Sequence, residues 1–272
     1  MGKIRLGKTG ILAEKNAFGA LPVQRVDKPA AVRLLRRAHE GGMDYFDTAR
    51  FYTDSEEKLG EAFAGIRDEV VIATKTGAAT PEAFWEDLHT SLRLLNTDHI
   101  DVYQFHNPAF VPEPGDGTGM YECMLEAKKQ GKILHIGFTN HRLRLAHRCI
   151  ESGFYETLQF PFSYLASPED IAVVRACAAA DMGFIAMKAL SGGLITDSRA
   201  ASAFMNGYDG VLPIWGIQRE NELDEFLSYI SAPPAMDGET EKFILREKES
   251  LSGDFCRGCG YCMPCPMGIE IN

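Results

Sequence analysis

The segment Met43-Asp-Tyr-Phe-Asp-Thr-Ala-Arg-Phe-Tyr52 joins a short apolar run to an acid, Asp47, and a phenol, Tyr52. Similar apolar runs recur along the chain, and their ends lie mostly 28 to 32 residues apart, with one gap of 21. These runs end near Gly19, Asp47, Lys75, His106, Phe138, Gln159, Met187 and Trp215. Each interval has room for one strand and one helix, so the pattern predicts eight copies of a strand and helix unit.

Alternating strand and helix patterns predict a parallel sheet, which is either open or closed into a barrel. Eight units at nearly constant spacing favour closure, that is, an α/β fold of the (β/α)8 TIM-barrel type. A glycine-rich G-x-G-x-x-G loop after the first strand is absent, which argues against an open dinucleotide-binding sheet. Residues 3–15, with Lys8-Thr-Gly10 at the turn, predict an N-terminal hairpin that plugs the barrel floor.

The expected elements alternate in type along the chain. Strands are expected at 16–20, 43–46, 70–75, 100–106, 133–138, 157–160, 184–187 and 211–215, and helices at 29–40, 53–63, 81–95, 121–129, 143–150, 168–180, 197–205, 220–230 and 240–249. A break containing two adjacent prolines, residues 231–239, follows the last barrel helix. We therefore expect a barrel over residues 1–231 and a small helical, cysteine-rich extension over residues 232–272.

Composition narrows the class of protein. The chain has 272 residues, of which 45% are hydrophobic and 24% charged, as is ordinary for a soluble globular enzyme. A net charge of -10 disfavours nucleic acids and anionic membrane surfaces as partners. The N-terminus lacks the apolar segment of a signal peptide, and no apolar run approaches the length of a membrane span. We expect a cytoplasmic protein without a nucleic-acid or membrane partner.

Three ionisable side chains end consecutive expected strands: Asp47, Lys75 and His106. The carboxyl ends of barrel strands converge on one mouth, so these side chains should meet there, with Tyr52 on the loop after Asp47. A free phenol has a pKa of about 10, and a neighbouring ammonium such as that of Lys75 lowers it. Taken singly, each residue has an ordinary structural interpretation. Together they predict a proton-transfer site, in which Asp47 holds the lysine and His106 orients a carbonyl or the phenol.

The sequence resembles the aldo/keto reductase family over residues 3–231. The resemblance rests on Leu6-Gly-Lys-Thr-Gly10, Asp44-Tyr-Phe-Asp-Thr-Ala49, Tyr52, Glu57 with Leu59-Gly60, Ala73-Thr-Lys75, His106, Ile136-Gly-Phe-Thr-Asn140 and Gln159. It implies a barrel that binds extended NAD(P)H and transfers a hydride to a small-molecule aldehyde or ketone. It also implies that Tyr52 is the general acid and that Asp47, Lys75 and His106 complete a catalytic tetrad.

By the same resemblance, Thr139, Asn140 and Gln159 would hold the carboxamide of the nicotinamide. Thr139-Asn140 is also expected to cap the helix that follows. The family often places a tyrosine under the nicotinamide after the seventh strand, where this chain has Met187 followed by Lys188. Stacking at that position is therefore expected to be weaker or different.

The segment after the eighth strand would bind the adenosine end of the cofactor. In the family, basic residues there hold the 2′-phosphate, but here Gln218 and Arg219 are followed by acids at 220, 222, 224 and 225. Carboxylates disfavour a 2′-phosphate and bond a free ribose hydroxyl. The segment therefore favours NADH slightly over NADPH.

The seven cysteines are distributed unevenly. Three stand alone on expected helices and are expected to be core residues, whereas four crowd together as Cys256, Cys259, Cys262 and Cys265. This distribution indicates a reducing compartment and a metal site rather than a disulfide framework. Thiolates on one short loop suit a [4Fe-4S] cluster better than zinc, whose ligand pairs are more often separated by a longer segment.

The cysteine-rich tail resembles bacterial ferredoxin loops and, more closely, the C-terminal loops of a subgroup of aldo/keto-reductase-like proteins that carry iron–sulfur motifs. It has two rather than three residues before the last cysteine, which leaves open whether Cys265 ligates the same cluster. Two hypotheses follow. The first is a reductase with an accessory cluster, structural or serving a redox partner protein. The alternative is an iron–sulfur electron-transfer or redox-sensing protein that uses the barrel as a scaffold. The complete tetrad favours the reductase.

Overall fold

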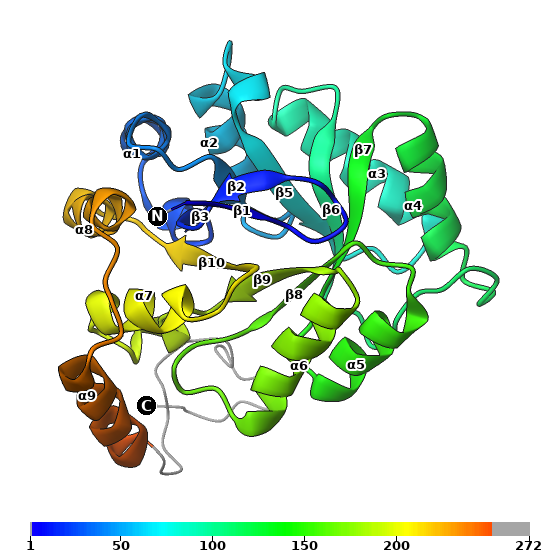
Figure 1. Ribbon diagram of the computed structural model, residues 1–272. Coiled ribbons are helices and arrows are strands. Elements are labelled where there is room, and N and C mark those ends of the chain that lie inside the picture. Colours follow the sequence, from blue (N-terminus) through cyan, green and yellow to red (C-terminus); the bar gives the residue numbers. More distant parts are fainter. Residues whose placement is uncertain (1, 252–272) are drawn as a thin grey trace, which may run out of the picture.

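The structure is a computed structural model that describes residues 2–251. Eight parallel strands close into a barrel in the order β10-β3-β4-β5-β6-β7-β8-β9, with the helices outside them (Figure 1). The predicted TIM barrel is confirmed. The barrel strands are β3 (Ala17–Gly19), β4 (Tyr45–Asp47), β5 (Val71–Thr76), β6 (Ile100–His106), β7 (Ile133–Thr139), β8 (Thr157–Pro161), β9 (Gly183–Met187) and β10 (Val211–Gly216).

Helices connect successive strands and cover the outside of the barrel. The α-helices are α1 (Lys28–Glu40), α2 (Ser55–Ala62), α3 (Pro81–Leu94), α4 (Met120–Lys129), α5 (Leu143–Ser152), α6 (Pro168–Ala179), α7 (Ser198–Asn206), α8 (Glu220–Ser231) and α9 (Gly238–Ser250). Short 3-10 turns lie at η1 (Pro22–Arg25), η2 (Arg67–Glu69) and η3 (Ser191–Gly193). None of the helices within residues 2–251 has the length and apolarity needed to cross a membrane.

The N-terminal hairpin crosses the barrel strands, as Figure 1 shows. Its strands, β1 (Lys3–Arg5) and β2 (Leu12–Glu14), pair antiparallel, as the sequence predicted. Leu6 beside this hairpin is fully buried among inward-facing barrel residues. Gly7 has a φ of 53°, and a Cβ there would lie 2.2 Å from the backbone nitrogen of Gly183 at the start of β9. The hairpin therefore covers the amino-terminal end of the barrel, opposite the carboxyl-terminal mouth.

Side chains alternate between the barrel interior and the helix layer along each strand. On β6, Val102 belongs to the small interior cluster, whereas Tyr103 and Phe105 belong to the larger core beneath the helices. Gln104 and His106 share the inward face with Val102 because they follow it by two and four residues. This alternation decides which strand-end side chains enter the mouth.

The expected strands and helices agree with the observed bounds to within two residues, but the expected helix cap was wrong. The second barrel strand, expected at residues 43–46, is Tyr45–Asp47, and Asp47 is its last residue. Thr139-Asn140 does not form the helix cap: Thr139 ends β7 in register with His106, and the N-cap residue of α5 is Arg142. The strand continues further than expected because Thr139 still pairs with both neighbouring strands.

Helix α9 follows the proline-containing break and packs beside α7 (Figure 1). Its Ile244 is buried in the same core cluster as the barrel's outer layer. The three lone cysteines, Cys123, Cys149 and Cys177, are also buried, as expected of core residues. The helical part of the C-terminal extension is thus joined to the barrel core through one apolar face.

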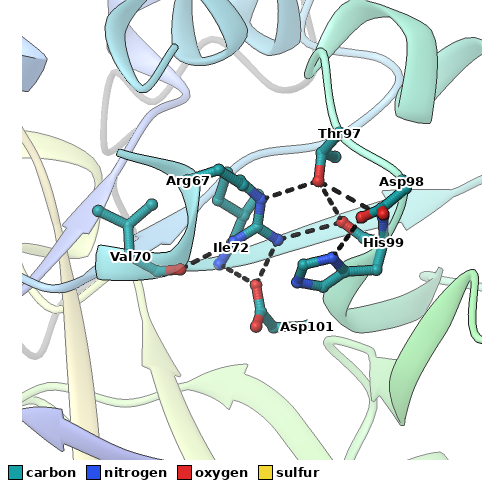
Figure 2. A network of polar contacts seen from close by, with 7 residues as sticks. All are labelled: Arg67, Val70, Ile72, Thr97, Asp98, His99 and Asp101. Atoms are coloured by element: carbon teal, nitrogen blue, oxygen red, sulfur yellow. Dashed lines mark hydrogen bonds and ion pairs between the residues drawn. The ribbon is translucent and has the colours of Figure 1, made fainter. Parts of the chain in front are cut away.

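A polar network ties β5 to β6 at the amino-terminal end of the barrel (Figure 2). The Arg67 guanidinium donates to the carbonyl oxygens of Val70 (2.9 Å) and His99 (3.1 Å) and to the carboxylate of Asp101 (2.6 Å). Asp101 also accepts from the backbone nitrogen of Ile72 at 2.8 Å. Arg67 therefore satisfies strand-start carbonyls that the sheet ladder leaves unpaired.

Arg67→Ala is expected to lower the free energy of unfolding by ~1–3 kcal/mol, since it leaves two carbonyls and a carboxylate without their charged donor. Urea denaturation followed by circular dichroism measures the loss. Arg36→Ala, at an exposed position of α1, is the matched control and should stay within about 0.5 kcal/mol of the wild type. Equal midpoints for the two variants would contradict a stabilising role for the network.

Candidate active site

The mouth of the barrel contains a buried ion pair between Asp47 and Lys75. The Lys75 Nζ lies 2.6 Å from Asp47 Oδ1 and donates to the Thr48 carbonyl oxygen, also at 2.6 Å. Lys75 is 0% and Asp47 2% exposed. Burial raises the pKa of Asp47 and lowers the pKa of Lys75, and the attraction between the two side chains opposes both changes. Each residue therefore depends on the other to stay charged at neutral pH.

Tyr52 and His106 lie beside this pair, as the strand-end pattern predicted. The Lys75 Nζ is 5.4 Å from the centre of the Tyr52 ring. The Tyr52 and His106 rings meet edge to face with their centres 5.8 Å apart. The structure thus brings all four predicted tetrad residues together at the carboxyl-terminal mouth.

The imidazole of His106 sits in an apolar and cationic environment. Phe51 stacks on it with ring centres 5.7 Å apart, although Phe51 itself is 63% exposed. Burial, followed by the charge of Lys75 and the neighbouring His141, lowers the pKa of His106 to about 3. The ring is therefore neutral at neutral pH and has one N–H to donate.

The loop that carries Tyr52 is anchored by a buried ion pair that the sequence analysis missed. Arg50 pairs with Glu56, whose Oε1 accepts from the hydroxyls of Thr74 and Ser91, each at 2.7 Å. Glu57, the acid quoted in the family motif, instead pairs with Lys28 at the surface. The helical spacing could have indicated this, because positions 56, 59 and 60 of α2 and the C-cap position 63 lie on one face, which carries no charged residue except Glu56.

A second buried group, also missed, connects the predicted carboxamide residues to the ion pair. Gln104 Nε2 donates to Gln159 Oε1 (2.9 Å) and lies 3.5 Å from Asp47 Oδ2. The hydroxyl of Thr139 donates to Gln104 Oε1 at 2.8 Å. Asn140 is also buried, but its side chain binds the Pro108 carbonyl oxygen and nearby backbone, so it anchors the following loop. Strand alternation could have identified Gln104, which lies two residues before His106.

The carboxyl-terminal end of β9, the seventh strand of the barrel, borders a hollow of about 220 Å³. Met187 ends β9 and belongs to the barrel interior, and Lys188 follows it with a φ of 56°. Lys188 lines the hollow together with Asp170, Ser163 and Ser191, and the hydroxyl oxygens of the two serines lie 3.0 Å apart. The lysine and the two hydroxyls offer donors to an anionic group, whereas the carboxylate of Asp170 opposes one.

The acidic residues that follow β10, the eighth strand of the barrel, have partners within the protein. Glu222 accepts from the backbone nitrogens of Gln218 and Arg219 and from the Arg219 side chain, so it closes the start of α8. Glu220 and Asp224 both pair with Arg37 on α1. These carboxylates therefore stabilise the packing of α8, a role that the sequence analysis had not foreseen.

Cys256, Cys259, Cys262 and Cys265 lie outside the described residues, so the structure says nothing about the expected cluster. Within residues 2–251, no group of three or more histidine, cysteine, aspartate or glutamate side chains could hold a metal ion.

The His106 imidazole is expected to remain neutral on acidification to about pH 4, since its folded-state pKa is about 3 against an ordinary value of 6.5. Below pH 6.5 the unfolded chain takes up a proton that the folded chain does not, so stability falls as the pH falls. NMR titration of the imidazole, assigned with His106→Gln, checks the charge state. That variant should also lose less stability between pH 7 and pH 4, and a midpoint near pH 6.5 would refute the prediction.

The chain resembles proteins of known family. The family model described as the aldo/keto reductase family matches residues 15–209. The uncharacterized oxidoreductase YqkF of Bacillus subtilis is 27% identical, over 60% of this chain and 56% of its own length. The NADH-specific methylglyoxal reductase of Escherichia coli is 25% identical, over 82% of this chain and 77% of its own length.

A solved aldo/keto reductase from Klebsiella pneumoniae in complex with NADPH shares the fold, with a TM-score of 0.74 and 21% identity over 90% of this chain and 94% of that chain. The chain spans about half the length of the first curated relatives it matches. The family-model match covers most of the closed barrel described above. The chain therefore belongs to the aldo/keto reductase family.

Proposed function

We propose that this protein is an NAD(P)H-dependent oxidoreductase that reduces a small-molecule aldehyde or ketone. The observation that carries the proposal is the cluster of Tyr52, Lys75, Asp47 and His106 at one mouth, with the lysine and aspartate fully desolvated. A barrel used only as a scaffold would not need a buried ion pair beside a phenol. The cluster therefore favours the reductase over the electron-transfer alternative.

The residues at the mouth fit the cofactor. Thr139 and Gln159 offer buried polar groups of the kind that bind a carboxamide. Lys188 and two serine hydroxyls offer donors to a phosphate at the hollow, which Asp170 also lines. When bound, the reduced nicotinamide supplies the hydride. Met187 takes the position where many family members have a stacking tyrosine.

The chain's own residues would handle the proton. The Tyr52 hydroxyl donates its proton to the oxygen of the substrate carbonyl, and the Lys75 ammonium stabilises the phenolate that remains. Asp47 keeps Lys75 charged and in place. His106, being neutral, donates a hydrogen bond to the carbonyl oxygen without competing as an acid. The exposed ring of Phe51 forms an apolar wall beside this point.

The choice between NADH and NADPH stays a prediction. In the sequence, the acidic residues after β10 favoured NADH. In the structure, Glu220, Asp224 and Glu222 each have a cationic side chain as partner. The relatives include both an NADH-specific reductase and a structure that contains NADPH. We therefore propose NAD(P)H as the cofactor class and expect a weaker preference for NADH than the sequence suggested.

Tyr52→Phe is expected to reduce carbonyl-dependent NAD(P)H oxidation by roughly 10²–10⁴-fold while leaving cofactor affinity nearly unchanged, since it removes only the donated proton. A panel of aldehydes and ketones, followed at the nicotinamide absorbance, measures turnover. Tyr208→Phe, the same exchange outside the cluster, is the matched control. Equal turnover in wild type and Tyr52→Phe, or none in either, would refute the reductase proposal.

We also propose that residues 232–272 form an extension in which Cys256, Cys259, Cys262 and Cys265 bind a [4Fe-4S] cluster. Four closely spaced thiols are the donor set that such clusters use. The cluster would supply one-electron chemistry or a structural link, and a redox partner protein would be needed only in the first case. A cluster of this kind accords with the expected reducing, cytoplasmic location.

Anaerobically purified protein is expected to be brown and to contain iron and sulfide near four per chain, on the cubane stoichiometry. Metal and sulfide analysis measures both. Cys259→Ser should lose iron, whereas Cys123→Ala, a change at a buried core cysteine, should retain it. Colourless protein with stoichiometric zinc would contradict the cluster without affecting the reductase proposal.

A further inference from the structure

Gln104 lies on the inward face of β6, two residues before His106, and is 0% exposed. Its side-chain amide contacts residues of three other strands: Asp47 on β4, Thr139 on β7 and Gln159 on β8. Gln159 in turn donates from Nε2 to Asp47 Oδ1 at 3.3 Å. The residues that would hold the cofactor carboxamide are thereby linked to the Asp47–Lys75 ion pair.

Gly137 makes room for Gln104 to reach β8. It lies between the two strands on β7, paired with Gln104 on one side and Thr157 on the other. A Cβ at position 137 would stand 2.7 Å from Gln104 Cγ and 2.5 Å from Thr157 Oγ1. Any residue other than glycine at this position would force Gln104 or Thr157 to shift. The close approach of Gln104 to β8 therefore depends on the absence of a side chain at position 137.

The hydrogen bonds of this group run in one direction. Thr139 donates to Gln104, Gln104 donates to Gln159, and Gln159 donates to Asp47, which also accepts from Lys75. The negative charge of Asp47 dictates this direction, because a reversed amide would face the carboxylate with its oxygen. The hydroxyl proton of Thr139 is therefore used in the hydrogen bond to Gln104, and only the lone pairs of its oxygen remain for a ligand.

We propose that Gln104 is a positioning residue that orients Thr139 and Gln159 for the nicotinamide carboxamide and couples that orientation to the ionised state of Asp47. The inference rests on the proposed function and extends it. Thr139 then accepts from the carboxamide nitrogen, and Gln159 is held with its amide nitrogen toward Asp47. Cofactor binding and the proton-transfer pair thus share one buried hydrogen-bond chain.

The groups around Asp47 set the expected pH behaviour. Lys75 faces it from β5, Tyr45 shares its strand, and Gln104 and Gln159 face it from β6 and β8. Burial raises the pKa of Asp47, and donors from Lys75, Gln159 and Gln104 act against that rise. Removing Gln104 takes away one donor to the charged form, so the acid limb of the kcat/KM profile should move to higher pH.

Two variants test the proposal. Gln104→Met keeps the length of the side chain and removes its three hydrogen bonds, whereas Gln104→Glu keeps the acceptor for Thr139 but places a carboxylate against Asp47. Fluorescence titration should show NAD(P)H dissociation constants about five- to tenfold higher for Gln104→Met, the effect of one buried hydrogen bond. The acid limb should move upward in both variants and further in Gln104→Glu, where like charges meet.

Thr157→Val is the matched control, because its hydroxyl is buried beside Gln104 yet has no hydrogen-bond partner in the described part of the chain. It should leave the dissociation constant and the pH profile unchanged. If Gln104 had only a structural role, its replacement would lower the stability of the protein and the maximum of the kcat/KM profile without moving the acid limb of that profile. An unmoved limb or a wild-type dissociation constant in Gln104→Met would overturn the inference.

The outcomes separate this inference from the proposed function. If the wild type turns over and Gln104→Met matches it, only the inference fails. If the wild type binds NAD(P)H but reduces no carbonyl, the reductase proposal fails, and the titrations still decide whether Gln104 orients the cofactor residues. If the wild type does not bind NAD(P)H, both fail.

Discussion

The buried ion pair between Asp47 and Lys75 is the interaction on which the mouth of the barrel depends. A desolvated charge without its partner costs several kcal/mol, so neither residue is tolerated there alone. The surrounding groups complete the pair: the Thr48 carbonyl accepts from the ammonium, and Gln159 and Gln104 supply hydrogen bonds to the carboxylate. The same ammonium lies near the Tyr52 ring and helps to keep His106 neutral. The ion pair thus supplies the two buried charges of the cluster and adds to the effect of burial in lowering the pKa of His106.

Strand β5 supports this cluster from both of its faces. Lys75 points into the barrel, whereas Thr74 points outward and donates to the buried Glu56. Glu56 holds Arg50, and the Arg50 backbone nitrogen donates to the Lys75 carbonyl oxygen. The loop that ends in Tyr52 is therefore attached to the strand that carries Lys75 by both backbone and side chain. This double attachment explains how a residue on a loop keeps a fixed place beside residues on strands.

Much of the fold and of the tetrad could be predicted because both follow from periodic features of the chain. Apolar runs at regular spacing predicted the eight strands, and convergence of strand ends predicted the meeting of Asp47, Lys75 and His106. The errors were local. The cap expected at Thr139-Asn140 was wrong because β-pairing extended the strand, and Glu57 was emphasised over Glu56 because a motif does not show which face of a helix is buried.

The sequence by itself determined the strand–helix order, the closed barrel and the identity of the strand-end residues, since these depend on spacing and alternation along one chain. Only the tertiary structure decided which polar groups meet across strands. Gln104 reaches Gln159 because Gly137 leaves the space between them. Arg37 on α1 forms ion pairs with Glu220 and Asp224 of α8. Such partners are far apart in sequence and have no common period. Their contacts depend on the register and closure of the barrel, which bring distant strands and helices together.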